Sequence, residues 1–149
     1  CTKSLVDLFS KKNANIFSVE EIKLEDTKRY GIVSGSEIQD GLMLVNNLVE
    51  KPGPDSAPSL LGIQGRYVFK SELFHHLKKI SSGSKGEIQL TDAMNSLSKV
   101  QQMYSWTFKG KRYDIGTMED WFKSHIELST ISRFSKSLSR IMNKVDSFG

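Results

Sequence analysis

Proline placement constrains this chain more than any other feature. All three of its prolines lie within seven residues, at positions 52, 54 and 58. An apolar run at residues 42–49 enters this segment, and a second run at residues 60–69 leaves it. Proline fixes φ and lacks an amide hydrogen, so it cannot continue a central strand, and the residue before it, Lys51, is expected to be extended. The pattern predicts two strands joined by a rigid connection, with Glu50 and Lys51 at the end of the first.

Apolar periodicity predicts the remaining elements. Strand patterns occur at residues 15–22, 28–33 and 103–108, and helical patterns at residues 3–12, 71–80 and 91–100 and from residue 117 onward. Strands that alternate with helices indicate an α/β sandwich with a mixed sheet.

Short polar signals predict where these elements end. Ser71 and Thr91 are expected to cap the helices that follow them, and Thr117 with Asp120 resembles a capping box. Turns are expected at residues 34–35 and 40–41, where a serine and an aspartate each precede a glycine.

The composition is that of a soluble globular domain, or of a piece of a larger one. Of 149 residues, 38% are hydrophobic and 26% are charged. No apolar run approaches the ~20 residues of a membrane span, and no signal peptide opens the chain, so no membrane partner is expected. The single cysteine, Cys1, cannot form an internal disulfide, which fits a reducing cytoplasm.

The end of the chain, residues 131–149, is expected to be a separate amphipathic helix following a domain of residues 1–130. Its apolar residues recur at intervals of three and four and must pack against the domain or a partner, which suggests a homo-oligomer: Phe134, Leu138, Ile141, Met142 and Val145. The net charge of +4 permits anionic partners. Basic residues gather on this helix without an aromatic platform, so a nucleic-acid partner is not expected.

Three segments could carry chemistry. The Glu50 carboxylate could accept from sugar hydroxyls while the Lys51 ammonium neutralises a phosphate, although an ordinary surface ion pair explains the same residues. Adjacent strand residues point to opposite faces, so the backbone must twist before Pro52 for both to reach one ligand. Asp114 could bind Mg²⁺ or could only satisfy the turn beside it, and Lys85 could reach a phosphate or remain a surface lysine.

Other catalytic patterns are missing from the sequence. His75, His76 and His125 have no zinc-site spacing, and packing or surface roles explain them. The sequence contains no glycine-rich phosphate-binding loop and no convincing nucleophile with a partner base. No catalytic residue is therefore assigned to this chain.

Several segments together resemble the bacterial UTP–glucose-1-phosphate uridylyltransferases. They include residues 30–33 (YGIV), 49–52 (VEKP), 57–59 (APS), 65–68 (GRYV), 86–93 (GEIQLTDA) and 114–116 (DIG), in that order. The similarity covers most of residues 1–130, and the run at residues 86–93 is its most specific part. The resemblance implies a Rossmann-like α/β fold with the ligand at the strand ends.

The resemblance also implies a reaction and a set of binding residues. The reaction joins UTP and glucose 1-phosphate to give UDP-glucose and pyrophosphate, with Mg²⁺. The implied sugar-phosphate contacts are Gly31, Glu50, Lys51, Ile63 and Lys85, and the implied Mg²⁺ ligand is Asp114.

The family's N-terminal, nucleotide-binding part has no counterpart in this sequence. The chain opens without a methionine, directly before a helical pattern, and is expected to be a C-terminal fragment that is inactive alone. Its sheet is expected to have exposed edges that promote self-association. The alternative is a non-catalytic module for sugar-phosphate binding or oligomerisation.

Overall fold

A computed structural model describes residues 1–80, 87–113, 115–132 and 134–145, with side chains as far as residue 141. The helices are α1 (Thr2–Lys12), the short 3₁₀ helix η1 (Leu24–Lys28), α2 (Leu73–Lys79), α3 (Leu90–Ser98), α4 (Met118–Ile131) and α5 (Ser135–Val145). The strands are β1 (Asn15–Glu21), β2 (Gly31–Gln39), β3 (Leu42–Glu50), β4 (Leu61–Val68) and β5 (Met103–Thr107). The chain divides into two compact units, residues 1–109 and residues 110–149, which are described separately.

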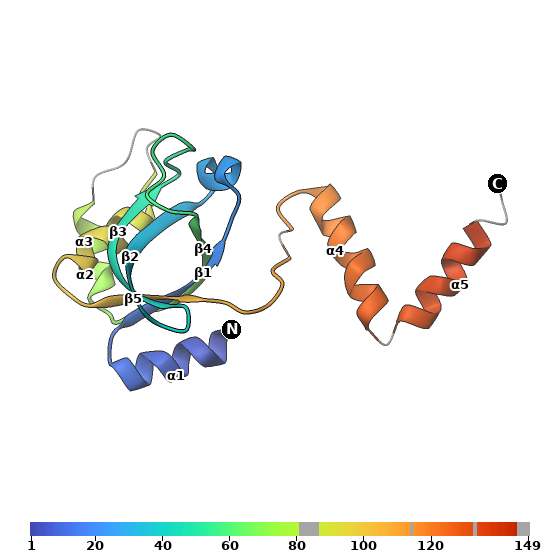
Figure 1. Ribbon diagram of the computed structural model, residues 1–149, viewed down its shortest axis with the longest axis horizontal. Coiled ribbons are helices and arrows are strands. Elements are labelled where there is room, and N and C mark those ends of the chain that lie inside the picture. Colours follow the sequence, from blue (N-terminus) through green and yellow to red (C-terminus); the bar gives the residue numbers. More distant parts are fainter. Residues whose placement is uncertain (81–86, 114, 133, 146–149) are drawn as a thin grey trace. The chain divides into compact units, whose positions relative to one another are not determined.

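The first unit is built on one mixed sheet that closes on itself (Figure 1). The strand order around it is β1-β4-β2-β3-β5. The β1–β5 pair is parallel and the other pairs are antiparallel, which confirms the mixed sheet expected from the sequence. Closure was not expected, and the exposed sheet edges predicted from the sequence are wrong, because each described strand of a closed sheet has a neighbour on both sides.

Two apolar clusters hold this unit together. The larger joins the sheet to α2 and α3 through Phe17, Val19, Val33, Met43, Val45, Leu48, Ile63, Leu73, Ala93, Met94, Leu97 and Met103. The smaller packs α1 against β1, β3 and β5 through Leu5, Ala14, Ile16, Leu42 and Tyr104. Because α3 shares the larger cluster with β3, its first turn lies close to the end of that strand.

Strand β2 differs from its prediction at both ends. Residues 24–28 form η1, so the strand begins only at Gly31. It then runs through Ser34 and Gly35, where a turn was predicted, with a register shift against β3 at that point. A bulge, which inserts a residue without ending the strand, explains the glycine there. The turn predicted at Asp40 and Gly41 is confirmed, with φ angles of 44° and 75°.

Two predicted helix caps are wrong. The N-cap of α2 is Glu72 rather than Ser71, and the N-cap of α3 is Gln89 rather than Thr91. Neither cap residue makes a side-chain capping bond. Thr91 lies inside the first turn of α3, and its hydroxyl has a different partner, described below.

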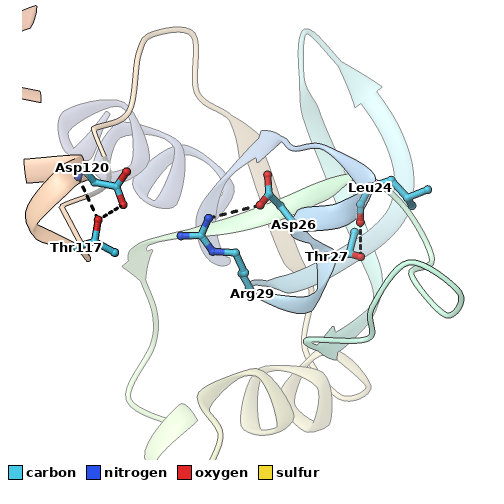
Figure 2. A network of polar contacts seen from close by, with 6 residues as sticks. All are labelled: Leu24, Asp26, Thr27, Arg29, Thr117 and Asp120. Carbon is cyan, nitrogen blue, oxygen red and sulfur yellow. Dashed lines mark hydrogen bonds and ion pairs between the residues drawn. The ribbon is translucent and has the colours of Figure 1, made fainter. Parts of the chain in front are cut away.

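The cap predicted for α4, in the second unit, is confirmed. Thr117 is its N-cap, and its hydroxyl oxygen accepts from the Asp120 amide at 3.1 Å while donating to the Asp120 carboxylate at 2.8 Å (Figure 2). Thr117→Ala is expected to destabilise α4 by about 1 kcal/mol, since one of the first amides loses its acceptor. Circular dichroism during thermal unfolding measures this, with Thr130→Ala at the other end of α4 as control. Equal loss of helix in both variants would contradict the capping role.

Candidate functional site

A polar cleft of about 860 Å³ lies at the end of β3. Its walls come from η1, from the C-terminal end of β3 and from residues 87–95, which lead into α3 and form its first part. The lining residues are Lys28, Asn47, Leu48, Val49, Glu50, Lys51, Glu87, Gln89, Asp92 and Asn95. The cleft therefore contains the charged pair that the prolines single out in the sequence.

The backbone twists between Glu50 and Pro52, as a shared ligand requires. Lys51 has a φ of 46°, in the left-handed region, so the extended backbone expected for it is wrong. Its amide donates to the Tyr30 carbonyl at 3.2 Å, which continues the pairing of β2 and β3 past the strand end. This conformation brings Nζ of Lys51 to 3.4 Å from Oε1 of Glu50, so both side chains line the same cleft.

Gly31 and Ile63 are buried near this carboxylate and are not among the residues that line the cleft. A Cβ atom at Gly31 would lie 3.0 Å from Oε2 of Glu50, 3.0 Å from Cδ1 of Ile63 and 2.9 Å from Oγ1 of Thr91. At such distances a side chain on residue 31 would force these neighbouring side chains to shift. The structure thus brings together Gly31, Glu50, Lys51 and Ile63, which belong to three different strands and the turn after one of them.

Thr91 completes this group and was missed as a site residue. Its hydroxyl donates to Oε2 of Glu50 at 2.6 Å, and the residue is only 7% exposed. The sequence placed Thr91 in the most specific family segment but favoured a capping role, because threonine before an apolar run is a common N-cap. Only the packing of α3 on β3 reveals its contact with Glu50.

Tyr67 on β4 is affected by the same carboxylate. Burial raises the pKa of its phenol, and the negative charge of Glu50 raises that pKa further. Its ring stacks on Phe69 at 5.6 Å and packs near Phe17 at 6.5 Å. The phenol therefore stays protonated at neutral pH and carries no charge that would compete with Glu50 for Lys51.

The segment that leads into Gly31 is fixed by local bonds (Figure 2). Thr27 is fully buried, and its hydroxyl donates to the Leu24 carbonyl at 2.7 Å. Asp26 and Arg29 form an ion pair of 3.5 Å across the same turn. These bonds hold η1 in place and present Lys28, a residue that the sequence did not single out, to the cleft.

Lys85 and Asp114 lie outside the described residues, so their expected roles rest on sequence alone. In the described ranges, no three His, Cys, Asp or Glu side chains gather closely enough to hold a metal ion. Nor does any described helix have the length and apolar character to cross a bilayer.

Comparison with known proteins gives a consistent family. A family model described as nucleotidyl transferase matches residues 2–130. A UTP–glucose-1-phosphate uridylyltransferase of Bacillus subtilis is 39% identical over 127 residues, which cover 85% of this chain and 44% of that protein. A protein of the same name from Staphylococcus epidermidis is 35% identical over 145 residues, covering 97% of this chain and 50% of its own length.

Solved structures agree with these relatives. A crystal structure of UDP-glucose pyrophosphorylase complexed with UDP-glucose superposes with a TM-score of 0.83 at 32% identity, covering 87% of this chain and 49% of that one. The apo form of a UDP-glucose pyrophosphorylase gives a TM-score of 0.79 at 34% identity and covers 83% and 45%. The Rossmann-like nucleotidyltransferase fold expected from the sequence is confirmed. The chain spans about half the length of the curated relatives it matches.

Proposed function

Because this chain belongs to the nucleotidyl transferase family, we propose that it forms the sugar-phosphate side of an enzyme that makes UDP-glucose and pyrophosphate from UTP and glucose 1-phosphate. The observation that supports this most is the turn at Lys51. It places one carboxylate and one ammonium 3.4 Å apart at the wall of a cleft. A sugar phosphate needs both kinds of group, an acceptor for its hydroxyls and a cation for its phosphate.

The described residues divide this binding work among them. Lys51, 53% exposed, is free to swing its ammonium toward the phosphate. Glu50, 22% exposed, presents its carboxylate to the sugar hydroxyls. Gly31 and Ile63 are buried beside Glu50, so we assign them the task of giving its carboxylate room rather than a direct sugar contact. The pair thus binds the two ends of one small ligand.

The proposed reaction is an in-line transfer of a uridylyl group. A phosphate oxygen of glucose 1-phosphate forms a bond to the α-phosphorus of UTP. At the same time, the bond breaks between the α-phosphorus and the oxygen that bridges it to the β-phosphorus. Pyrophosphate leaves with the electron pair of that bond. Orientation and charge neutralisation dominate such reactions, so holding the attacking phosphate is the contribution expected of Lys51.

Asp114 and Lys85 enter this proposal on the family resemblance alone. We assign Asp114 as one ligand of Mg²⁺, which when bound would neutralise phosphate charge. We assign Lys85 as a second, weaker phosphate contact. The homo-oligomer expected from the apolar residues of the last helix stays a prediction.

Lys51→Met tests the proposal. Removing the ammonium is expected to weaken glucose 1-phosphate binding by about tenfold to a hundredfold, because a charged hydrogen bond contributes about 1.5–3 kcal/mol. Isothermal titration calorimetry of this chain measures the dissociation constant. Lys79→Met, an exposed lysine in the last turn of α2, is the matched control and should bind like wild type.

Two results would count against the assignment. If Lys51→Met and Lys79→Met bind equally well, Lys51 does not hold the phosphate. If this chain alone, supplied with UTP, glucose 1-phosphate and Mg²⁺, releases pyrophosphate continuously, it is more than the sugar-phosphate side. Its sequence has no glycine-rich phosphate-binding loop, so binding without turnover is expected.

A further inference from the structure

The Glu50 carboxylate is the only group in the proposed site that is held by a buried side chain of another element within the described residues. The donor is Thr91, on the first turn of α3, and the bond is 2.6 Å long. Thr91 is the second residue of α3, so no preceding turn of the helix offers a carbonyl to its hydroxyl. Here the hydroxyl leaves its own helix and bonds to a residue 41 positions away in the chain.

Helix α3 is fastened to β3 in a way that fixes this donor. Oδ1 of Asn95 accepts from the Leu48 amide at 3.3 Å, and the Lys99 ammonium donates to the Asn46 carbonyl at 2.8 Å. Ala93, Met94 and Leu97 of α3 are buried in the larger apolar cluster, which also contains residues of β3. The position of the Thr91 hydroxyl relative to Glu50 is therefore set by the packing of the whole helix rather than by a mobile loop.

The two oxygens of the Glu50 carboxylate face different partners. Oε2 accepts from Thr91, and Oε1 lies 3.4 Å from the Lys51 ammonium. Without a fixed donor on Oε2, the carboxylate could rotate about its last side-chain bonds and lose this orientation. The bond from Thr91 thus fixes the orientation of the carboxylate in which only Oε1 lies near Lys51.

From this geometry we propose that Thr91 is a positioning residue, which holds the Glu50 carboxylate ready to accept from sugar hydroxyls. This inference rests on the proposed function and deepens it. It predicts that the binding of two ligands, the sugar phosphate and phosphate alone, responds differently to loss of the Thr91 hydroxyl. Losing the hydroxyl should weaken recognition of the sugar but not of phosphate alone, because Lys51 does not depend on Thr91 for its own charge.

The test compares glucose 1-phosphate with inorganic phosphate as calorimetric probes of this chain. Thr91→Val keeps the shape of the side chain and removes the hydroxyl. It is expected to weaken glucose 1-phosphate binding about tenfold while leaving inorganic phosphate binding unchanged. Thr91→Ser restores the donor and should restore binding. Ser98→Ala, whose hydroxyl only bonds to the Asn95 carbonyl in the same helix, is the control and should bind both probes like wild type.

The outcomes separate this inference from the proposed function. If wild-type chain and Thr91→Val bind glucose 1-phosphate equally, while Glu50→Gln binds it weakly, Thr91 has no positioning role although the proposed function holds. If the wild-type chain does not bind glucose 1-phosphate, both the inference on Thr91 and the proposed function are wrong. Should Thr91→Val lose its cooperative thermal transition, Thr91→Ala is measured in its place. Equal weakening of both probes in a folded variant would show a general packing defect and overturn the inference.

Discussion

Gly31→Ala is expected to abolish most glucose 1-phosphate binding while leaving the protein folded. The added methyl would lie 3.0 Å or less from Oε2 of Glu50, Oγ1 of Thr91 and Cδ1 of Ile63. All three are side-chain atoms, and those of Glu50 and Ile63 are the ends of flexible chains that can move. Binding is expected to fall by about a hundredfold, equivalent to about 2.7 kcal/mol, because the added methyl displaces the carboxylate from the orientation in which it accepts from the sugar.

The free energy of unfolding should change little in this variant. Alanine in a strand restricts the unfolded chain more than glycine does, which stabilises by about 0.5–1 kcal/mol and offsets part of the crowding. Calorimetry of ligand binding and thermal unfolding of the same samples separate the two effects. Gly62→Ala on β4 is the control, because its methyl would meet only the Ile22 side chain, at 3.1 Å. Unchanged binding in Gly31→Ala would remove Gly31 from the site.

The sequence predicted where β3 ends but not the conformation of the residue that follows it. The prolines after Lys51 end β3 where predicted, since a missing amide hydrogen is a local property of the residue. The backbone of Lys51 was predicted wrongly because the preference for an extended residue before proline is weak compared with a tertiary bond. Its amide pairs with Tyr30, on a segment separated from it by the whole β2–β3 hairpin.

Contacts between distant segments account for the other missed features. β4 pairs with both β1 and β2, and β5 pairs with β1 and β3, which closes the sheet. Alternating apolar residues predict each strand but carry no information on its neighbours. The contact between Thr91 and Glu50 depends on the same assembly, so the sequence alone favoured a local cap. Placement of Glu50 was thus predictable, and the residue that orients it was not.

Gly35 lies on β2, four residues after Gly31. In contrast to Gly31→Ala, Gly35→Ala is expected to cause a large loss of stability, although Gly35 lies outside the site. A Cβ atom at Gly35 would overlap the carbonyl oxygen of Leu44 and lie 2.9 Å from its carbonyl carbon. These are backbone atoms of β3, which pairs with β2 across this bulge. They cannot move without separating the two strands, so a loss of at least about 3 kcal/mol in the free energy of unfolding is expected, at the upper end of single substitutions.

Urea unfolding followed by tryptophan fluorescence measures this loss, and Ser36→Ala is its control. Ser36 is an exposed neighbour on β2 that makes only a 3.5 Å bond to Asn46, so its removal should cost within about 0.5 kcal/mol. A Gly35→Ala protein as stable as Ser36→Ala would mean that β2 and β3 separate easily at the bulge. In that case the hairpin could not hold Gly31 against Glu50 at its other end. The fixed geometry proposed for sugar recognition depends on tight pairing of β2 with β3, and a large loss of stability in Gly35→Ala would be the sign of that tight pairing.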